Sequence, residues 1–148
     1  MFYPLAMIIR KATRSDSLDV LAWRNDPLTR AMSRSPEEIA KAAHLAWFDK
    51  ALRSPRLTLL IGEQDGRKVG MVRFDHGEQT EVSINLNPAC RGERLGSALL
   101  AEALKSVGGD LTAEVKGENL ASRRLFEDAG FAFRSVREGL RQYVLRRS

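Results

Sequence analysis

The stretch of this sequence richest in candidate chemistry runs from Ile84 to Leu100 and reads INLNPACRGERLGSALL. A strand-like segment passes through a proline and a basic, glycine-containing turn directly into an amphipathic helix. The first N–H groups of a helix have no intrahelical partner and carry the positive end of the helix dipole, so this turn is suited to bind a phosphate. An ordinary strand-to-helix turn is the alternative reading.

Side chains in this turn support the same chemistry. Arg91 and Arg94 add positive charge, and Gly92 and Gly96 let the backbone approach a phosphate closely. Cys90 lies beside them, where two arginines and a helix start could activate a thiol as a nucleophile. The sequence places no histidine as its partner, so we expect no role for Cys90.

A second motif follows at residues 119–131, which read NLASRRLFEDAGF. Together the two segments resemble the Gcn5-related N-acetyltransferases, whose coenzyme A loop reads R/QxxGxG/A and whose later motif reads NxxSxxLYxxxGF. The matching residues are Arg91, Gly96, Asn119, Ser122, Leu125, Gly130 and Phe131. The resemblance covers essentially the whole chain and implies one domain over residues 1–148.

The resemblance implies an α/β (α+β) fold of the acyl-CoA N-acyltransferase type, a mixed and mostly antiparallel sheet of about seven strands with four helices. It also implies direct transfer of acetyl from acetyl-CoA to a primary amine in a ternary complex, without a metal. Backbone groups of Ile84, Asn85 and Leu86 would meet the pantetheine and thioester where the strand at 81–86 separates from that at 110–115. The other implied coenzyme contacts are Arg91, Gly92, Glu93, Arg94, Leu95, Gly96, Ser97, Asn119, Ser122 and Phe126. Capping its own helix is the alternative role of Asn119.

Two positions depart from the family pattern. Arg94 stands where the coenzyme loop usually has its first glycine, although a guanidinium can itself hold a phosphate. Phe126 stands where many members have a tyrosine that protonates the departing thiolate, and a phenyl ring donates no proton. Tyr143 or water would then protonate the thiolate. A non-catalytic acyl-CoA-binding module is the alternative that Phe126 raises.

The reaction also needs a base to take a proton from the acceptor ammonium. Glu114 is the first candidate, because Leu111, Ala113 and Val115 alternate on one face of its strand and leave Glu114 on the other. Its spacing to Phe126 resembles that of the glutamate base and tyrosine acid in ribosomal-protein acetyltransferases. Glu81 is the second candidate, acting through water. A surface glutamate paired with a lysine or arginine is the plain alternative for Glu114.

The acceptor side is read from two further segments, WRNDPLTRAM at 23–32 and HLAWF at 44–48. They resemble the branch of the family that acetylates amino groups of nucleotide-linked sugars in flagellin glycosylation. Similar openings occur in ribosomal-protein and other N-acetyltransferases, so a protein N-terminus or another small amine is the alternative acceptor. The implied acceptor-binding residues are Arg24, Arg30, Met32, His44 and Trp47. The plain alternatives are core packing for Trp47, a satisfied or solvent-facing position for His44, and solvation for the arginines.

These residues need a sheet with helices to position them. Hydrophobic patterning predicts strands over 7–13, 57–63, 68–75, 81–86, 110–115, 131–137 and 140–146. It predicts a helix after Ser15 and Asp16 that ends soon after Trp23, and a polar loop over 24–34. A second helix should start at Ser35–Pro36 and end near Arg53, a third should cover 95–103, and a fourth should run from Asn119 to Gly130.

Composition excludes several classes of protein. With 148 residues and one cysteine, the chain suits neither a multidomain enzyme, a disulfide-stapled secreted domain nor a zinc domain, and we expect it in the cytoplasm. The opening run MFYPLAMII is too short for a membrane span. The net charge of +5 is concentrated in five C-terminal arginines, for which solvated strand edges are favoured over a nucleic-acid site. We therefore expect a small-molecule partner, no nucleic acid and no membrane; a homodimer stays open.

Overall fold

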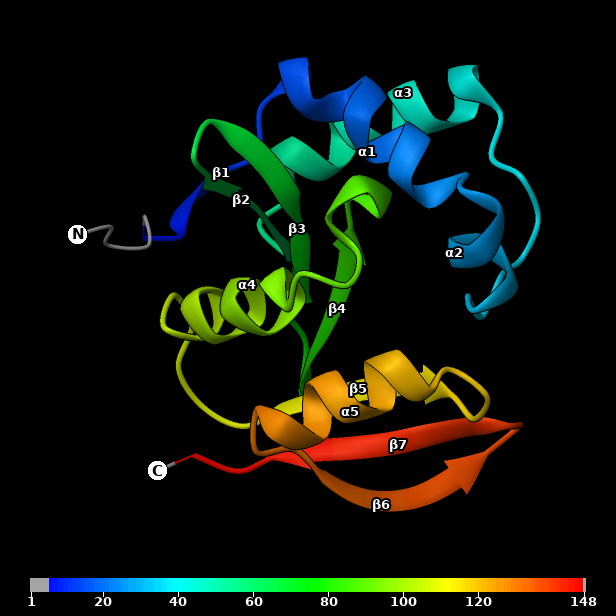
Figure 1. Cartoon of the computed structure of the whole chain (residues 1–148), viewed down its shortest axis with the longest axis vertical. Coiled ribbons are helices and arrows are strands. Elements are labelled where there is room, and N and C mark those ends of the chain that lie inside the picture. Colours follow the sequence, from blue (N-terminus) through cyan, green and yellow to red (C-terminus); the bar gives the residue numbers. More distant parts are fainter. Residues whose placement is uncertain (1–5, 148) are drawn as a thin grey trace.

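The computed structural model describes residues 6–147, which form one seven-stranded sheet in the order β1-β2-β3-β4-β5-β7-β6 (Figure 1). Neighbouring strands are antiparallel except β4 and β5, which are parallel. The predicted mixed, mostly antiparallel sheet is therefore confirmed. The strands are β1 (Ile8–Lys11), β2 (Leu57–Gln64), β3 (Arg67–Asp75), β4 (Thr80–Leu86), β5 (Leu111–Lys116), β6 (Ala132–Arg137) and β7 (Leu140–Leu145).

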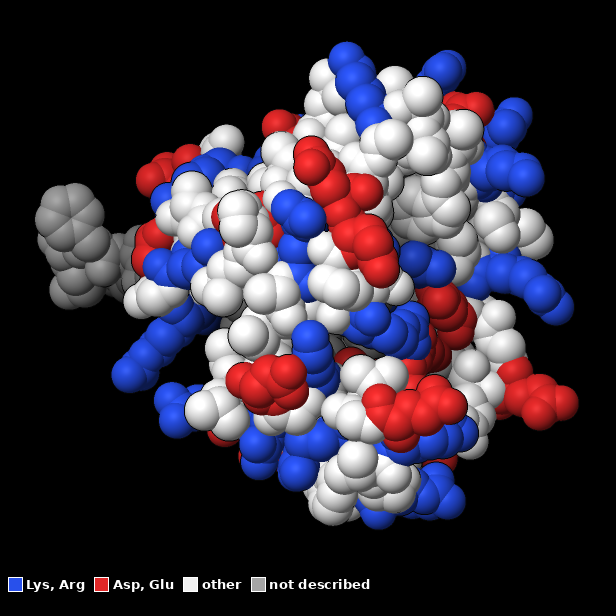
Figure 2. All heavy atoms as spheres, turned by 90° about the vertical axis from the view of Figure 1, so that its right-hand side faces the viewer, with Lys and Arg blue, Asp and Glu red and all other residues white. Residues whose placement is uncertain are grey.

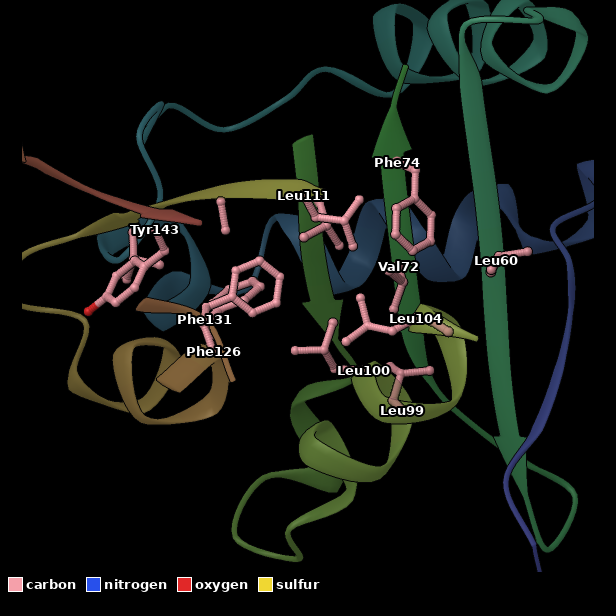
Figure 3. Close-up of a cluster of buried hydrophobic side chains, with 14 of the residues drawn as sticks. Leu60, Val72, Phe74, Leu99, Leu100, Leu104, Leu111, Phe126, Phe131 and Tyr143 are labelled. Atoms are coloured by element: carbon pink, nitrogen blue, oxygen red, sulfur yellow. The ribbon is translucent and has the colours of Figure 1, made fainter. Parts of the chain in front are cut away.

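Two layers of helices cover the sheet, because successive strand side chains point to opposite faces. Leu60 joins the larger core cluster under α4 (Leu95–Leu104) and α5 (Leu120–Asp128), which Figure 3 shows. Its neighbours Leu59 and Ile61 join the second cluster, under α1 (Ser17–Arg24) and α3 (Lys41–Arg53). On β5 the same alternation buries Leu111, Ala113 and Val115 and leaves Thr112 and Glu114 on the opposite face, as predicted.

The structure corrects the helix count, because residues 6–147 contain five α-helices rather than four. The additional one is α2 (Pro27–Ala31), in the segment predicted as a loop. Asp26 caps it by accepting a hydrogen bond from the Thr29 N–H at 3.0 Å, and Pro27 takes the first helical position. The Asp-Pro pair is a helix-start signal that sequence reasoning took only as a stop.

The start of the second predicted helix is also wrong. Helix α3 begins at Lys41, although it ends at Arg53 as expected. The cause is a tertiary contact: the Asn25 side chain accepts from the Ile39 N–H at 2.8 Å and donates to the Ile39 carbonyl at 2.9 Å. Because both backbone groups of Ile39 are bound in this way, they cannot join a helix that starts at Pro36.

Within residues 6–147, no helix is long and apolar enough to cross a membrane. In the same range, no group of three or more His, Cys, Asp or Glu side chains is placed to hold a metal ion. Residues 1–5 of the apolar opening run lie outside the described part of the chain.

Candidate active site

The separation of β4 from β5 is the central feature of the site. Only two residue pairs join these strands, Thr80 with Leu111 and Glu81 with Thr112, although β4 continues to Leu86. On its other side β4 stays paired with β3 up to Leu86. Beyond Glu81, the β5-facing backbone groups of β4 therefore have no strand partner and can bind amides of a ligand.

The turn after β4 leads into α4 in the way an anion site requires. A short 3-10 turn (Pro88–Cys90) precedes it, and Gly92 and Arg94 both adopt positive φ, 78° and 60°. No side chain caps α4, so the N–H groups of its first turn stay open to a bound anion. The left-handed backbone at Arg94 explains why a glycine suits this position, since a side chain there costs about 1 kcal/mol.

The other residues predicted for this turn have separate environments. Arg91 donates to the Asp26 carboxylate, and Glu93 accepts from Arg67 at 2.8 Å. Gly96 is buried, but a Cβ there would meet its nearest neighbours at 3.5 Å or more, so packing within the chain does not require a glycine. Leu95 packs against the core, whereas Ser97 is exposed in the first turn of α4.

The two candidate bases lie on one face of the sheet but differ in their partners. Glu114 is only 16% exposed in its side chain and binds Arg34, Gln142 at 3.0 Å and Arg137 at 3.7 Å. Glu81 has neither a hydrogen bond nor an ion pair with any residue in 6–147. Burial raises the pKa of the Glu81 carboxyl above its usual value, and nearby Glu114 raises it further against the opposing effect of Arg34. The geometry therefore favours Glu81 over Glu114 as the base.

Helix α1 positions Arg24 on the same face of the sheet. The helix starts where Lys68 of β3 binds Asp19 at 2.8 Å, and the Val20 carbonyl accepts from Asn85 of β4 at 3.4 Å. Arg24 follows one turn after Val20 and lies close enough to Arg73 for the charge of Arg73 to act on it. Figure 2 shows basic and acidic side chains gathered around a recess on the side of the molecule where α2 lies.

Arg24 makes neither a hydrogen bond nor an ion pair with any described residue. Burial lowers the pKa of its guanidinium, and the charges of Arg73 and Arg34 lower it further. Arg73 is itself paired with Asp75 at 2.5 Å and stacks on the Trp47 ring at 5.1 Å. An unpaired, partly buried guanidinium among other cations is an environment that an anion would stabilise.

The remaining residues predicted for the acceptor are not brought together. His44 is buried in the core, and its Nε2 lies 2.9 Å from the Ser17 carbonyl, so it cannot reach an acceptor. The Trp47 ring packs on the core and under Arg73. Arg30 donates to the Pro36 carbonyl at 3.1 Å, and Met32 is a half-buried residue at the end of α2. The environment of His44 matches the plain alternative of a histidine that is satisfied within the fold.

Comparisons with known proteins agree with this geometry. The family model described as the acetyltransferase (GNAT) family matches residues 18–131. The chain belongs to the GNAT family of acetyltransferases. It is 30% identical over 138 residues to YwnH of Bacillus subtilis (strain 168), named as a candidate phosphinothricin acetyltransferase, covering 85% of this chain and 84% of that protein.

Other relatives extend the comparison. An uncharacterised N-acetyltransferase of Mycobacterium tuberculosis (strain H37Rv) is 29% identical over 84% of this chain and 87% of its own. A solved structure of a candidate phosphinothricin N-acetyltransferase shares 27% identity and a TM-score of 0.78, over 95% of this chain and 98% of that one. The structure of yncA from Salmonella typhimurium with its cofactor acetyl-CoA has 24% identity and a TM-score of 0.74, covering 95% and 94%. The predicted fold is confirmed.

Membership in this family makes the protein an N-acetyltransferase with acetyl-CoA as acyl donor. The residues present fit that donor. The uncapped first turn of α4 and the left-handed turn before it can hold the diphosphate, and the unpaired edge of β4 can bind the pantetheine amides. When bound, acetyl-CoA supplies the acetyl thioester that an amine attacks.

The later motif serves mainly to start α5. The Asn119 side chain accepts from the Ser122 N–H at 3.1 Å and donates to the Ser122 hydroxyl at 3.0 Å. The alternative role of Asn119, helix capping, is therefore present. Phe126 is buried and packs edge-on against Phe131 at 5.1 Å between ring centres, so its ring belongs to the core.

Tyr143 is poorly placed as the acid that would replace the missing tyrosine. Its side chain lies in the core with 0% exposure. Its hydroxyl donates to Glu127 at 2.6 Å and accepts from Arg141 at 2.9 Å. A hydroxyl that is bound twice and closed to solvent cannot reach a departing thiolate, so the structure argues against this role.

Cys90 is buried, and burial raises the pKa of its thiol above the usual value, with a smaller opposing effect of Arg67. The thiol is therefore not activated, in agreement with the expectation from sequence. Three of the C-terminal arginines have these partners in the fold: Arg137 binds Glu114, Arg141 stacks on Phe133 at 4.0 Å, and Arg147 donates to the Val107 carbonyl at 2.7 Å. These contacts favour the reading as solvated strand edges.

Sequence reasoning missed three residues of the site: Asp26, Arg34 and Arg73. Arg34 binds Glu114, and Arg73 lies close enough to affect both Glu81 and Arg24. Arg73 could have been found, because the alternation of β3 places it on the same face as Asp75. Arg34 carries no such signal, since it follows α2 in an irregular segment.

Proposed function

We propose that this acetyltransferase acts directly, in a ternary complex, on a small primary amine that also carries an anionic group, with Glu81 as the base. The unpaired guanidinium of Arg24 beside Arg73 and Arg34 is the observation that supports the anionic group. A neutral amine or a polyamine would leave Arg24 without a counter-charge, since Arg73 and Arg34 are already paired with Asp75 and Glu114. In this proposal residues 1–148 work as one domain.

Glu81 supports the proton-transfer part. Its carboxylate has no partner among residues 6–147, and its raised pKa makes it a stronger base than an exposed glutamate. It lies at the last residue pair before β4 leaves β5. From there a carboxylate oxygen of Glu81 accepts the proton of the acceptor ammonium, directly or through one water.

Two kinds of acceptor fit this chemistry. Phosphinothricin, which appears in the names of relatives, is an amino acid with a carboxylate and a phosphinate. A nucleotide-linked amino sugar carries a diphosphate, and the segments WRNDPLTRAM and HLAWF resemble enzymes for such substrates. A homodimer is compatible with either acceptor. The structure favours the property that both share, which is an anion attached to a primary amine.

The test measures thiol release from acetyl-CoA with pairs of amines that differ in one charge: each standard L-amino acid against its amide, and a nucleotide-linked amino sugar against the free amino sugar. We expect turnover with anionic members and a KM about tenfold or more higher for their neutral partners. Arg24→Gln should remove this difference, whereas Arg53→Gln, at the exposed last residue of α3, should retain it. Coenzyme binding without turnover on any amine would instead indicate a non-catalytic acyl-CoA-binding module.

A further inference from the structure

The segment 26–34, which contains α2, is held across the opening between β4 and β5 by polar contacts. At its start, Arg91 from the turn after β4 donates to the Asp26 carboxylate and to the Thr29 hydroxyl, the latter at 3.0 Å. None of the residues of α2 is buried. This end of α2 therefore depends on one arginine of the anion-binding turn rather than on apolar packing.

The other end of the segment is tied to β5. Lys116 donates to the Ala31 carbonyl at 3.0 Å, and Arg34 donates to Glu114. Lys116 and Glu114 lie on the strand that separates from β4. Segment 26–34 thus connects the two sides of the opening, with its first residue on the coenzyme turn and its last on β5.

We propose that Asp26 is a positioning residue that occupies Arg91 in place of a coenzyme phosphate. When the coenzyme binds, its phosphate takes over the Arg91 guanidinium, and the start of α2 is released while Lys116 and Arg34 still hold its end. Coenzyme binding in this way opens the acceptor side of the site. The proposal rests on the assignment of the coenzyme to the turn at 91–97, but not on the identity of the acceptor.

Charge and geometry support the exchange. A carboxylate and a phosphate are both bound by the same guanidinium edge, so one displaces the other. The hydrogen bond from Arg91 lowers the pKa of Asp26, which keeps this carboxylate ionised at neutral pH. The pair is only partly exposed, 19% for Asp26 and 38% for Arg91, so it competes effectively with an incoming ligand.

The experiment measures the Kd of coenzyme A by calorimetry in the full chain. Asp26→Asn keeps an oxygen that caps α2 and removes the charge that holds Arg91. We expect Asp26→Asn to bind coenzyme A about two- to fivefold more tightly than the wild type. Asp19→Asn, which removes an equal charge paired with Lys68, is the matched control and should leave the Kd unchanged.

A double-mutant cycle separates the exchange from a general charge effect. Arg91→Gln should weaken coenzyme binding, and Asp26→Asn should have no further effect in its presence. Equal tightening by Asp26→Asn and Asp19→Asn, or weaker binding by Asp26→Asn, would overturn the proposal. If Arg91→Gln left the Kd of coenzyme A unchanged, the proposed exchange at Arg91 would be wrong. The proposed acetyl transfer would not be affected by that result.

Hydrogen exchange gives an independent readout that needs no variant at Asp26. Saturating coenzyme A should speed amide exchange across residues 28–31 in the wild type, because the start of α2 loses its contact with Arg91. Arg91→Gln should show fast exchange there already without coenzyme. Slower exchange in the wild type on adding coenzyme would contradict the release of α2.

Discussion

Two carboxylates, Asp16 and Glu81, occupy contrasting regions of this molecule. Asp16 is fully buried and bound by Arg10 through two hydrogen bonds of 2.8 Å, by Lys68 at 2.8 Å and by the Thr13 N–H at 2.8 Å. These bonds hold the pKa of Asp16 far below its usual value, with the Arg10 bond as the largest cause. Glu81 has no such partner, and burial moves its pKa in the opposite direction.

The contrast distinguishes the region around Asp16, which stabilises the fold, from the opening between β4 and β5, which contains the candidate active site. Around Asp16, ion pairs with Arg10 and Lys68 join β1, β3 and the turn before α1, and they leave the Asp16 carboxylate fully partnered. At the β4–β5 opening, Glu81 and Arg24 are left unpaired in the range 6–147. Unpaired charges cost stability, and such costs gather at sites where a ligand supplies the missing partner.

The largest expected effect is on catalysis. Glu81→Gln should lower kcat/KM by about 10²- to 10⁴-fold, because it removes the base. Glu114→Gln, at a carboxylate already bound by Arg34 and Gln142, is the matched control and should lose less than about tenfold. Steady-state kinetics across pH should show the wild-type rate rising through the raised pKa of Glu81, a limb that Glu81→Gln lacks.

The same Glu81→Gln variant that loses activity should not lose stability. A carboxyl whose folded pKa is raised costs stability as the pH rises through that pKa, so Glu81→Gln should melt no lower than the wild type at neutral pH. A large drop in its melting temperature would show that Glu81 serves the fold instead.

The next effect is on the stability contributed by the ion pairs around Asp16. Asp16→Asn should lower the free energy of unfolding by about 3 kcal/mol, because Arg10 and Lys68 lose their buried partner. A depressed pKa stabilises the fold above the usual Asp pKa and loses this effect as the pH falls. The difference between Asp16→Asn and wild type in denaturant unfolding should therefore shrink below about pH 4. A constant difference down to low pH would contradict the pairing.

The smallest effect concerns backbone strain at Arg94, in the turn before α4. Arg94→Gly should raise the free energy of unfolding by about 0.5–1 kcal/mol, since glycine adopts positive φ without cost. The same change should weaken coenzyme binding through the loss of one charge near the diphosphate. Denaturant unfolding and calorimetry on one variant check both directions, and a loss of stability would show that the Arg94 side chain contributes more than its backbone strain.

Local pattern and family resemblance predicted most of the fold. Strand alternation placed Glu114 and the buried residues of β5 correctly, and the motif at 84–100 located the uncapped helix start. Two local signals misled: the Ser35–Pro36 pair caps no helix, because the Asn25 side chain binds Ile39, and Asp26–Pro27 starts one. The first error is a tertiary contact that no local pattern contains.

The different environments of the two candidate bases have the same kind of cause. Both glutamates lie on the expected face of their strands, but Glu114 is bound by Arg34, 80 residues before it in the sequence, as well as by Gln142 and Arg137. Such long-range pairs follow from the fold and cannot be read from spacing. Position on a strand was predictable, and the charge environment was not.

The two residue pairs between β4 and β5 have a consequence for how this protein should be handled. Only these pairs join the two halves of the sheet, so a ligand with amide groups that binds along the free edge of β4 would act as a substitute strand. Its binding free energy adds to folding, in proportion to the logarithm of its concentration. A melting temperature of this protein should therefore be compared only between samples with the same concentration of acyl donor.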